Sequence, residues 1–219
     1  MNNRPETRKY TFTVEGETER WYLYWLRDAI NASESAKFKV AIDAKVQQSP
    51  IKYAKGVNPK STPEVIHICD VESNEDVHVQ KFQRILSELK EANEQKSIIY
   101  NLGYSNFTFE LWMVLHKKNC NGALSHRSQY LSHINQAFGE KFENLDQYKH
   151  EDNFKRCLAK LSLEDVKAAI KRSKEIMNRN KSDNKKMIMY KGFKYYQDNP
   201  ALTIYEAIEK ILDECVELK

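Results

Sequence analysis

Strand-like and helix-like segments alternate over the first 117 residues, and this alternation is the strongest constraint on the fold. Runs rich in β-branched and aromatic residues predict strands at 9–14, 37–42, 64–69 and 97–101. Apolar residues at helical spacing predict helices at 19–31, 77–93 and 106–117. Thr18 and Ser105 precede two of these helices and are expected to cap them. The sequence therefore predicts an α/β fold with a mostly parallel sheet and helices on both faces.

The pattern changes after about residue 124, where only helices are predicted. Their ranges are 126–137, 151–160, 163–180 and 202–217. We therefore expect an α/β domain over 1–120, followed by a helical C-terminal region over 121–219 that packs on it. Residues 49–63 contain three Pro and one Gly and are predicted to form a loop.

Composition restricts the class of protein. The chain has 219 residues, of which 41% are hydrophobic, which is enough for a sizeable core. No apolar run approaches the roughly 20 residues of a membrane span, and the first residues have no apolar leader. The four cysteines form no CxxC pair, so neither a zinc site nor a disulfide framework is indicated. These features lead us to expect a cytoplasmic protein.

Positive charge is concentrated near the C-terminus. Residues 167–194 contain ten Lys and Arg but two Asp and Glu, whereas the whole chain has a net charge of only +4. A basic segment on an otherwise acidic body predicts a polyanionic partner such as nucleic acid. The residues expected to contact it are Lys171, Arg172, Lys174, Arg179, Lys181, Lys185 and Lys186. The alternative is that this segment is a solvated helix face.

Two acidic motifs follow predicted strands. Glu15 and Glu19 surround a turn at Gly16, between the first strand and its helix, and are expected to point into one space. Asp70 and Glu72 follow the strand at 64–69, and alternate residues of an extended segment point to the same side. Carboxylates that converge need protonation or a cation, and Mg²⁺ or Mn²⁺ prefers such oxygen ligands.

Each acidic motif also has a simpler interpretation. The carboxylate of Glu19 lies in the first turn of a predicted helix, where it would stabilise the helix dipole without any ligand. Asp70 and Glu72 begin a run that continues with Glu75 and Asp76, which is typical of a solvated acidic loop.

Three blocks of sequence resemble a known family. VEGETE at 14–19 and the later DVE at 70–72 resemble the Toprim (topoisomerase–primase) domain. More closely, FTVEGETERWYLYWL and SNFTFELWMVLH are similar to motifs of RloB-like proteins, a Toprim-related family associated with anti-phage defence. Ala168-Ala169-Ile170 and Asn199-Pro200 with Thr203 extend the resemblance to about residue 212. The EGxTE element is also similar to the Toprim part of OLD-family nucleases.

The resemblance implies roles for particular residues. Glu15 would be a general acid/base or metal ligand, Asp70 and Glu72 metal ligands, and Glu19 a ligand or a supporting group. Glu110 and His116 fall in the SNFTFELWMVLH motif as candidate catalytic residues. They lie about 120° apart on a helix, so they are not expected both to face a metal. His116 is equally well explained as a buried structural histidine.

The chain departs from the family pattern at two positions. Glu72 stands where the family usually has Asp, which adds about 1.5 Å of reach. Phe107 replaces a proline.

From these residues and the resemblance we expect a Toprim-like nuclease that uses Mg²⁺ or Mn²⁺ and acts on DNA or RNA in anti-phage defence. The alternative is a non-catalytic interaction or sensor module that works with a separately encoded ATPase. The chain itself has no GxxxxGK[ST] phosphate-binding loop.

Overall fold

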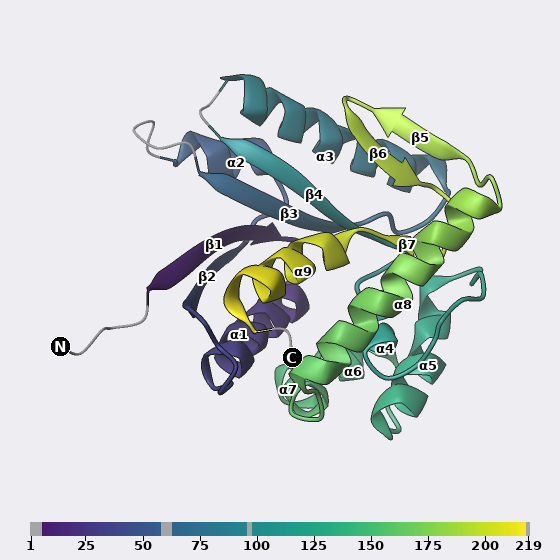
Figure 1. Ribbon diagram of the computed structural model, residues 1–219. Coiled ribbons are helices and arrows are strands. Elements are labelled where there is room, and N and C mark those ends of the chain that lie inside the picture. Colours follow the sequence, from purple (N-terminus) through teal and green to yellow (C-terminus); the bar gives the residue numbers. More distant parts are fainter. Residues whose placement is uncertain (1–5, 58–62, 96–97, 218–219) are drawn as a thin grey trace.

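A five-stranded sheet forms the centre of the protein (Figure 1). The computed structural model describes residues 6–57, 63–95 and 98–217. The strand order is β2-β1-β3-β4-β7, and the first three pairs are parallel. The strands are β1 (Thr7–Val14), β2 (Lys39–Val46), β3 (Glu64–Asp70), β4 (Ile99–Asn106) and β7 (Ala201–Leu202), and β7 runs antiparallel to β4. The predicted α/β fold with a mostly parallel sheet is confirmed.

Helices cover both faces of this sheet. Alternate residues of a strand point to opposite faces, and in β3 Ile66 and Ile68 belong to one core cluster while Val65 and Cys69 belong to another. The first cluster packs under α1 (Glu17–Asn31) and α9 (Ile204–Cys215), and the second packs under α2 (Pro50–Lys55) and α3 (Asp76–Gln95). Both faces are apolar, as a parallel sheet requires.

The remaining helices extend the first core cluster away from the sheet. They are α4 (Glu110–Leu115), the 3-10 turn η1 (Arg127–Gln129), α5 (Tyr130–Phe138), α6 (Leu145–Lys149), α7 (Glu151–Leu158) and α8 (Leu163–Ser182). Trp112, Tyr130, Tyr148 and Phe154 are fully buried among them, in the same cluster as Phe12 of β1. The C-terminal region therefore packs on the α/β part through one continuous core.

The prediction that only helices follow residue 124 is wrong. Residues 187–202 form β7 and a hairpin of β5 (Met187–Tyr190) and β6 (Phe193–Tyr196). Lys191 and Gly192 form the two-residue turn with φ values of 53° and 91°. Two positive φ values match the twist of a tight hairpin, and Gly adopts such a value without steric cost.

Three predicted element boundaries also need correction. The predicted loop at 49–63 contains α2, whose first turn begins with Pro50 and is capped by the Ser49 side chain, while residues 58–62 lie outside the described residues. Thr18 lies inside α1, because Gly16 occupies the N-cap position. Ser105 stays in β4, paired with Asp70 and Leu202, so α4 begins only at Glu110.

Of the predicted strand at 97–101, residue 97 also lies outside the described part. In the described ranges, no helix is both long enough and apolar enough to cross a membrane.

Candidate functional site

Parallel strands bring two of the predicted carboxylates together. Val14 ends β1 and pairs with Ile68 of β3, so Glu15 and Asp70 lie together at the carboxyl ends of these two neighbouring strands. The backbone N–H of Asp70 donates a hydrogen bond to Glu15 Oε2 at 3.0 Å. Glu15 thereby fastens the end of β3, and its second oxygen remains available.

A glycine makes room for the third carboxylate. Glu19 lies in the first turn of α1, is only 6% exposed, and its Oε2 accepts a hydrogen bond from Thr18 Oγ1 at 3.0 Å. A Cβ atom at Gly16 would stand 3.1 Å from that same oxygen. Any larger residue at position 16 would therefore require the Glu19 carboxylate to shift by a few tenths of an ångström.

Glu110 joins this group from the start of α4. Its side chain is fully buried and accepts a hydrogen bond from Thr108 Oγ1. Lys149, the last residue of α6, places its Nζ 3.1 Å from Glu110 Oε1. Nothing in the local sequence around Lys149 indicates this role, because the contact joins segments about forty positions apart.

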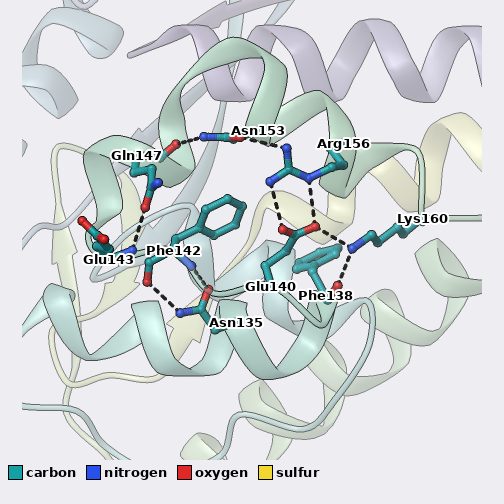
Figure 2. Close-up of polar contacts among 9 residues, drawn as sticks. All are labelled: Asn135, Phe138, Glu140, Phe142, Glu143, Gln147, Asn153, Arg156 and Lys160. Carbon is teal, nitrogen blue, oxygen red and sulfur yellow. Dashed lines mark hydrogen bonds and ion pairs between the residues drawn. The ribbon is translucent and has the colours of Figure 1, made fainter.

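Polar side chains fix the loop between α5 and α6, the helix that ends at Lys149 (Figure 2). Asn135 makes two hydrogen bonds to the backbone of Phe142, both 2.9 Å long. Glu140 accepts two hydrogen bonds from the Arg156 guanidinium and one from Lys160. Asn153 of α7 also donates to the Gln147 carbonyl oxygen of α6 at 2.7 Å, so these contacts tie α5, α6 and α7 into one unit.

Crowded carboxylates hold protons more tightly than usual. Burial raises the pKa of Asp70 well above its ordinary value, and the charges of Glu15, Glu19 and Glu110 raise it further. Burial and the charge of Glu110 likewise raise the pKa of Glu19 to about 7. The pKa of Glu15 is raised by burial too. Lys149 opposes all three shifts, so a positive charge here favours ionised carboxylates.

Glu72 is near the other carboxylates but turned toward different partners. Its φ of 35° ends the extended backbone, so Asp70 and Glu72 are not alternate residues of one strand, although both line the same cavity. The Glu72 carboxylate accepts a hydrogen bond from Lys81 and lies 3.3 Å from His78 Nε2. Burial alone would raise the pKa of Glu72, but the hydrogen bond and charge of Lys81 lower it.

The carboxylates surround a small cavity of about 260 Å³. Its lining contains five carboxylates, two cations and two small residues. They are Glu15, Glu17, Glu19, Asp70 and Glu72, then Arg127 and Lys149, and then Gly16 and Thr18. Carboxylates and cations in one lining suit a ligand that brings both a metal ion and a phosphate group. We call this space the acidic cavity.

The family comparison agrees with the motifs that form this cavity. The family model described as RloB-like protein matches residues 10–211. The chain belongs to the RloB-like family. No curated protein and no solved structure matches this RloB-like chain.

The carboxylates are not arranged as a finished metal site. Among the described residues, no group of three His, Cys, Asp or Glu side chains is placed to hold a metal ion. Two observations nevertheless fit a cation. Glu15 Oε1 is buried without a hydrogen-bond partner in the described chain, and its ion pair with Lys81 Nζ, at 3.8 Å, is longer than a hydrogen bond. The donors are also the hard oxygens that Mg²⁺ and Mn²⁺ prefer.

His116 lies apart from the acidic cavity in this RloB-like fold. It is 1% exposed, its Nε2 is 3.1 Å from the Tyr22 hydroxyl, and its Nδ1 is 2.9 Å from the Trp112 carbonyl oxygen. Burial lowers its pKa to about 4, so the ring is neutral at pH 7. The structural interpretation of His116 fits these contacts, and Glu110 and His116 do not share a site.

The predicted nucleic-acid contacts fall into two groups. Arg172 donates to the carbonyl oxygens of Leu115 and His116, and Lys174 pairs with Glu209 at 2.5 Å, so both already have partners within the fold. By contrast, several others have no ion pair in the described ranges: Lys171, Arg179, Lys181, Lys185 and Lys186. All five except Lys185 are exposed.

Three cations near the carboxylates were not found by sequence reasoning. Lys81 belongs to α3, Arg127 to η1 and Lys149 to α6. Each lies in a segment that reads as an ordinary amphipathic or polar stretch. Only the fold brings them to the strand ends.

Proposed function

We propose that this RloB-like protein is a Toprim-like, divalent-metal-dependent nuclease that acts in anti-phage defence. The observation that carries the proposal is the meeting of Glu15, Glu19, Asp70 and Glu110 at the carboxyl ends of β1, β3 and β4. Ligands of open α/β sheets bind outside the carboxyl ends of the strands. Folding alone gains nothing from gathering four carboxylates there, because like charges repel.

Mg²⁺ or Mn²⁺ would be held by Glu15, Asp70 and Glu72. The orphan oxygen of Glu15 and the raised pKa values of Glu15 and Asp70 support a cation at this position. When bound, such an ion polarises a phosphoryl oxygen and lowers the pKa of a coordinated water. Glu72 would first have to exchange its partly buried ion pair with Lys81 for the metal ion.

The side chains of the protein itself supply the other roles. Glu15 accepts or returns the proton of the attacking water. Lys149 and Arg127 line the cavity and hold phosphate oxygens as charged hydrogen-bond donors. Glu19 and Glu110 keep Lys149 charged, because their carboxylates raise its pKa against the effect of burial.

The proposal also covers the nucleic-acid contacts, the location and the partner of the protein. Five basic residues of 167–194 that have no ion pair in the described ranges, Lys171, Arg179, Lys181, Lys185 and Lys186, would bind the phosphate backbone of DNA or RNA. A cytoplasmic location is supported by four free cysteines, all buried. An accessory ATPase encoded separately is the partner that the family resemblance implies.

One experiment tests the metal site and the reaction together. Calorimetry with Mn²⁺ should show binding to the wild type and none to Asp70→Asn, and cleavage of a mixture of DNA and RNA should be lost in the same variant. Asp146→Asn is the matched control, because Asp146 is an exposed carboxylate in the first turn of α6.

Equal Mn²⁺ binding by wild type and Asp70→Asn would refute the metal site. Metal binding without cleavage of either nucleic acid would favour the non-catalytic sensor module.

A further inference from the structure

A second cavity lies at the outer edge of β4, away from the acidic cavity. It measures about 500 Å³, within the usual range for small-molecule sites. Its lining residues come from β3 and β4, from helices α8 and α9, and from the β5–β6 hairpin. The two cavities share no lining residue. We call this space the edge cavity.

The direction of the β4 peptide groups follows from one hydrogen bond. Ile99 N–H donates to the Pro63 carbonyl oxygen, on the side of β3. Successive peptide groups of a strand point to opposite sides. The N–H and C=O groups of Tyr100, Leu102 and Tyr104 therefore point away from β3. Leu102 and Tyr104 line the edge cavity, and Tyr100 directly precedes the lining residue Asn101.

Most of these outward groups are already satisfied. Tyr100 N–H donates to Asn93 Oδ1 at 2.7 Å, and Tyr104 N–H donates to Thr203 Oγ1 at 3.2 Å. Thr203 Oγ1 donates to the Leu102 carbonyl oxygen at 3.3 Å, and Thr203 N–H donates to that of Tyr104. Within the described chain, Leu102 N–H and the Tyr100 carbonyl oxygen remain without a partner.

One donor and one acceptor on the same edge match the polar edge of a nucleobase. The Watson–Crick edge of a base presents an acceptor next to a donor, as in N1 and the N6 amino group of adenine. A peptide strand that extended the sheet would need a longer row of free groups. Asn93 and Thr203 block that row on both sides. The edge therefore suits a base better than a strand.

The walls of the edge cavity suit the rest of a nucleotide. Phe193 and Tyr195 of β6 and Met177 of α8 supply apolar surface on which a ring can stack. Lys194 lines the cavity, is exposed, and has no ion pair in the described ranges, so it can contact a phosphate. The lining also contains two carboxylates, Glu64, which pairs with Lys210, and Glu206. The volume admits the larger ring system.

We propose that the edge cavity binds a purine nucleotide, whose base pairs with Leu102 N–H and the Tyr100 carbonyl oxygen. The nucleotide is either free or one unit of a single-stranded nucleic acid. The site stands apart from the proposed nuclease centre and does not require that centre to be catalytic.

The test measures binding of two probes by the full chain in a chelator-containing buffer. The probes are AMP and a single-stranded ten-residue oligoadenylate. Phe193→Ala should weaken binding about 5- to 100-fold, the usual loss on removing one stacking side chain. Ala207→Leu should weaken it as well, because Ala207 lines the cavity and the larger side chain fills it.

Two controls separate this site from other effects. Met189→Ala alters the same hairpin at a side chain that is 65% exposed and does not line the cavity, so it should bind like the wild type. Asp70→Asn should also bind normally, whatever it does to cleavage. Melting temperatures of all variants show which are folded.

The outcomes are distinct. Binding of AMP that both cavity variants weaken supports a free nucleotide as ligand. Binding of oligoadenylate alone, with the same dependence, supports a unit of a strand. Failure of both probes to bind, or binding that Ala207→Leu leaves unchanged in a folded protein, overturns the proposal.

Discussion

At the scale of single residues, Glu15 is the side chain least explained by folding. One oxygen is buried without a hydrogen-bond partner in the described chain, while the other holds the end of β3. Glu15→Gln keeps the oxygen that accepts from Asp70 N–H but removes the base. Activity should fall by about 10²–10⁴, the usual contribution of general acid–base catalysis. The melting temperature should stay the same or rise, because one of several repelling charges is lost.

The matched control for this variant is Glu75→Gln, in an exposed position of the same acidic stretch. It should keep full activity. A Glu15→Gln protein with wild-type cleavage rates would remove Glu15 from the mechanism.

Lys149 allows a second test at this scale. The Glu110 carboxylate is fully buried, and Lys149 is its cation. Lys149→Met should lower the free energy of unfolding by about 2–4 kcal/mol, somewhat less than for a wholly buried pair because Lys149 is partly exposed. Adding Glu110→Gln should recover much of that loss, since no buried charge remains. Chemical denaturation of the two single variants and the double variant measures this coupling.

The same residues show how far sequence alone predicts the site. Glu15 and Asp70 directly follow apolar strands, so the local sequence pattern is sufficient to place them at the carboxyl ends of the parallel strands. Lys149 reaches them only through the packing of α6, which no local pattern records. The turned backbone of Glu72 is also invisible, because nothing in its neighbours demands a positive φ.

At the scale of elements, the unit of α5, α6 and α7 depends on Glu140. Its hydrogen bonds from Arg156 and Lys160 lower its pKa from 4.5 to about 2. A carboxyl with a depressed folded-state pKa stabilises the fold above its unfolded-state pKa, and that contribution disappears as the pH falls toward the folded value. Glu140→Gln should therefore lower the melting temperature at pH 7 and cause progressively less change between pH 4.5 and pH 2.

Thermal melts of wild type and Glu140→Gln across that range test the linkage. Glu151→Gln is the control, since the ion pair of Glu151 with Lys155 joins two exposed side chains of one helix and should matter little. A melting difference at pH 7 that persisted unchanged near pH 2 would show that Glu140 acts through packing instead of charge.

Elements were predicted well where their patterns are long. Periodicity over 163–180 and 77–93 anticipates α8 and α3 to within a few residues. The β5–β6 hairpin was missed because its strands have four residues each and its turn is Lys-Gly. β7 has two residues and exists only because β4 offers an edge to pair with, which is a long-range condition.

At the scale of the whole molecule, charge is separated between two regions. Carboxylates gather at the ends of β1, β3 and β4, and unpaired cations gather on the last turns of α8 and on the segment that leads into β5. Residues near the amino ends of β1 and β2 carry further exposed cations, Lys9, Lys37 and Lys39. Cations are thus exposed both at the end of α8 and near the amino ends of β1 and β2. Only a measurement of binding distinguishes a specific phosphate contact from a general electrostatic attraction of nucleic acid.

The final prediction compares these two groups of exposed cations. If Arg179, Lys181 and Lys186 bind phosphates, reversing all three to Glu should weaken nucleic-acid binding at low salt. It should also reduce the slope of log K against log salt by about 2–3, because each lost phosphate contact contributes about 0.7–0.9. Lys9, Lys37 and Lys39, all reversed to Glu, give the same change of net charge at the opposite end of the strands and should leave the slope near the wild-type value. Fluorescence anisotropy with labelled DNA and RNA between 50 and 200 mM salt, a range over which such contacts normally cost several orders of magnitude in affinity, provides the slopes. Equal slopes for both triple variants would mean that only net charge matters and that the basic segment is a solvated surface.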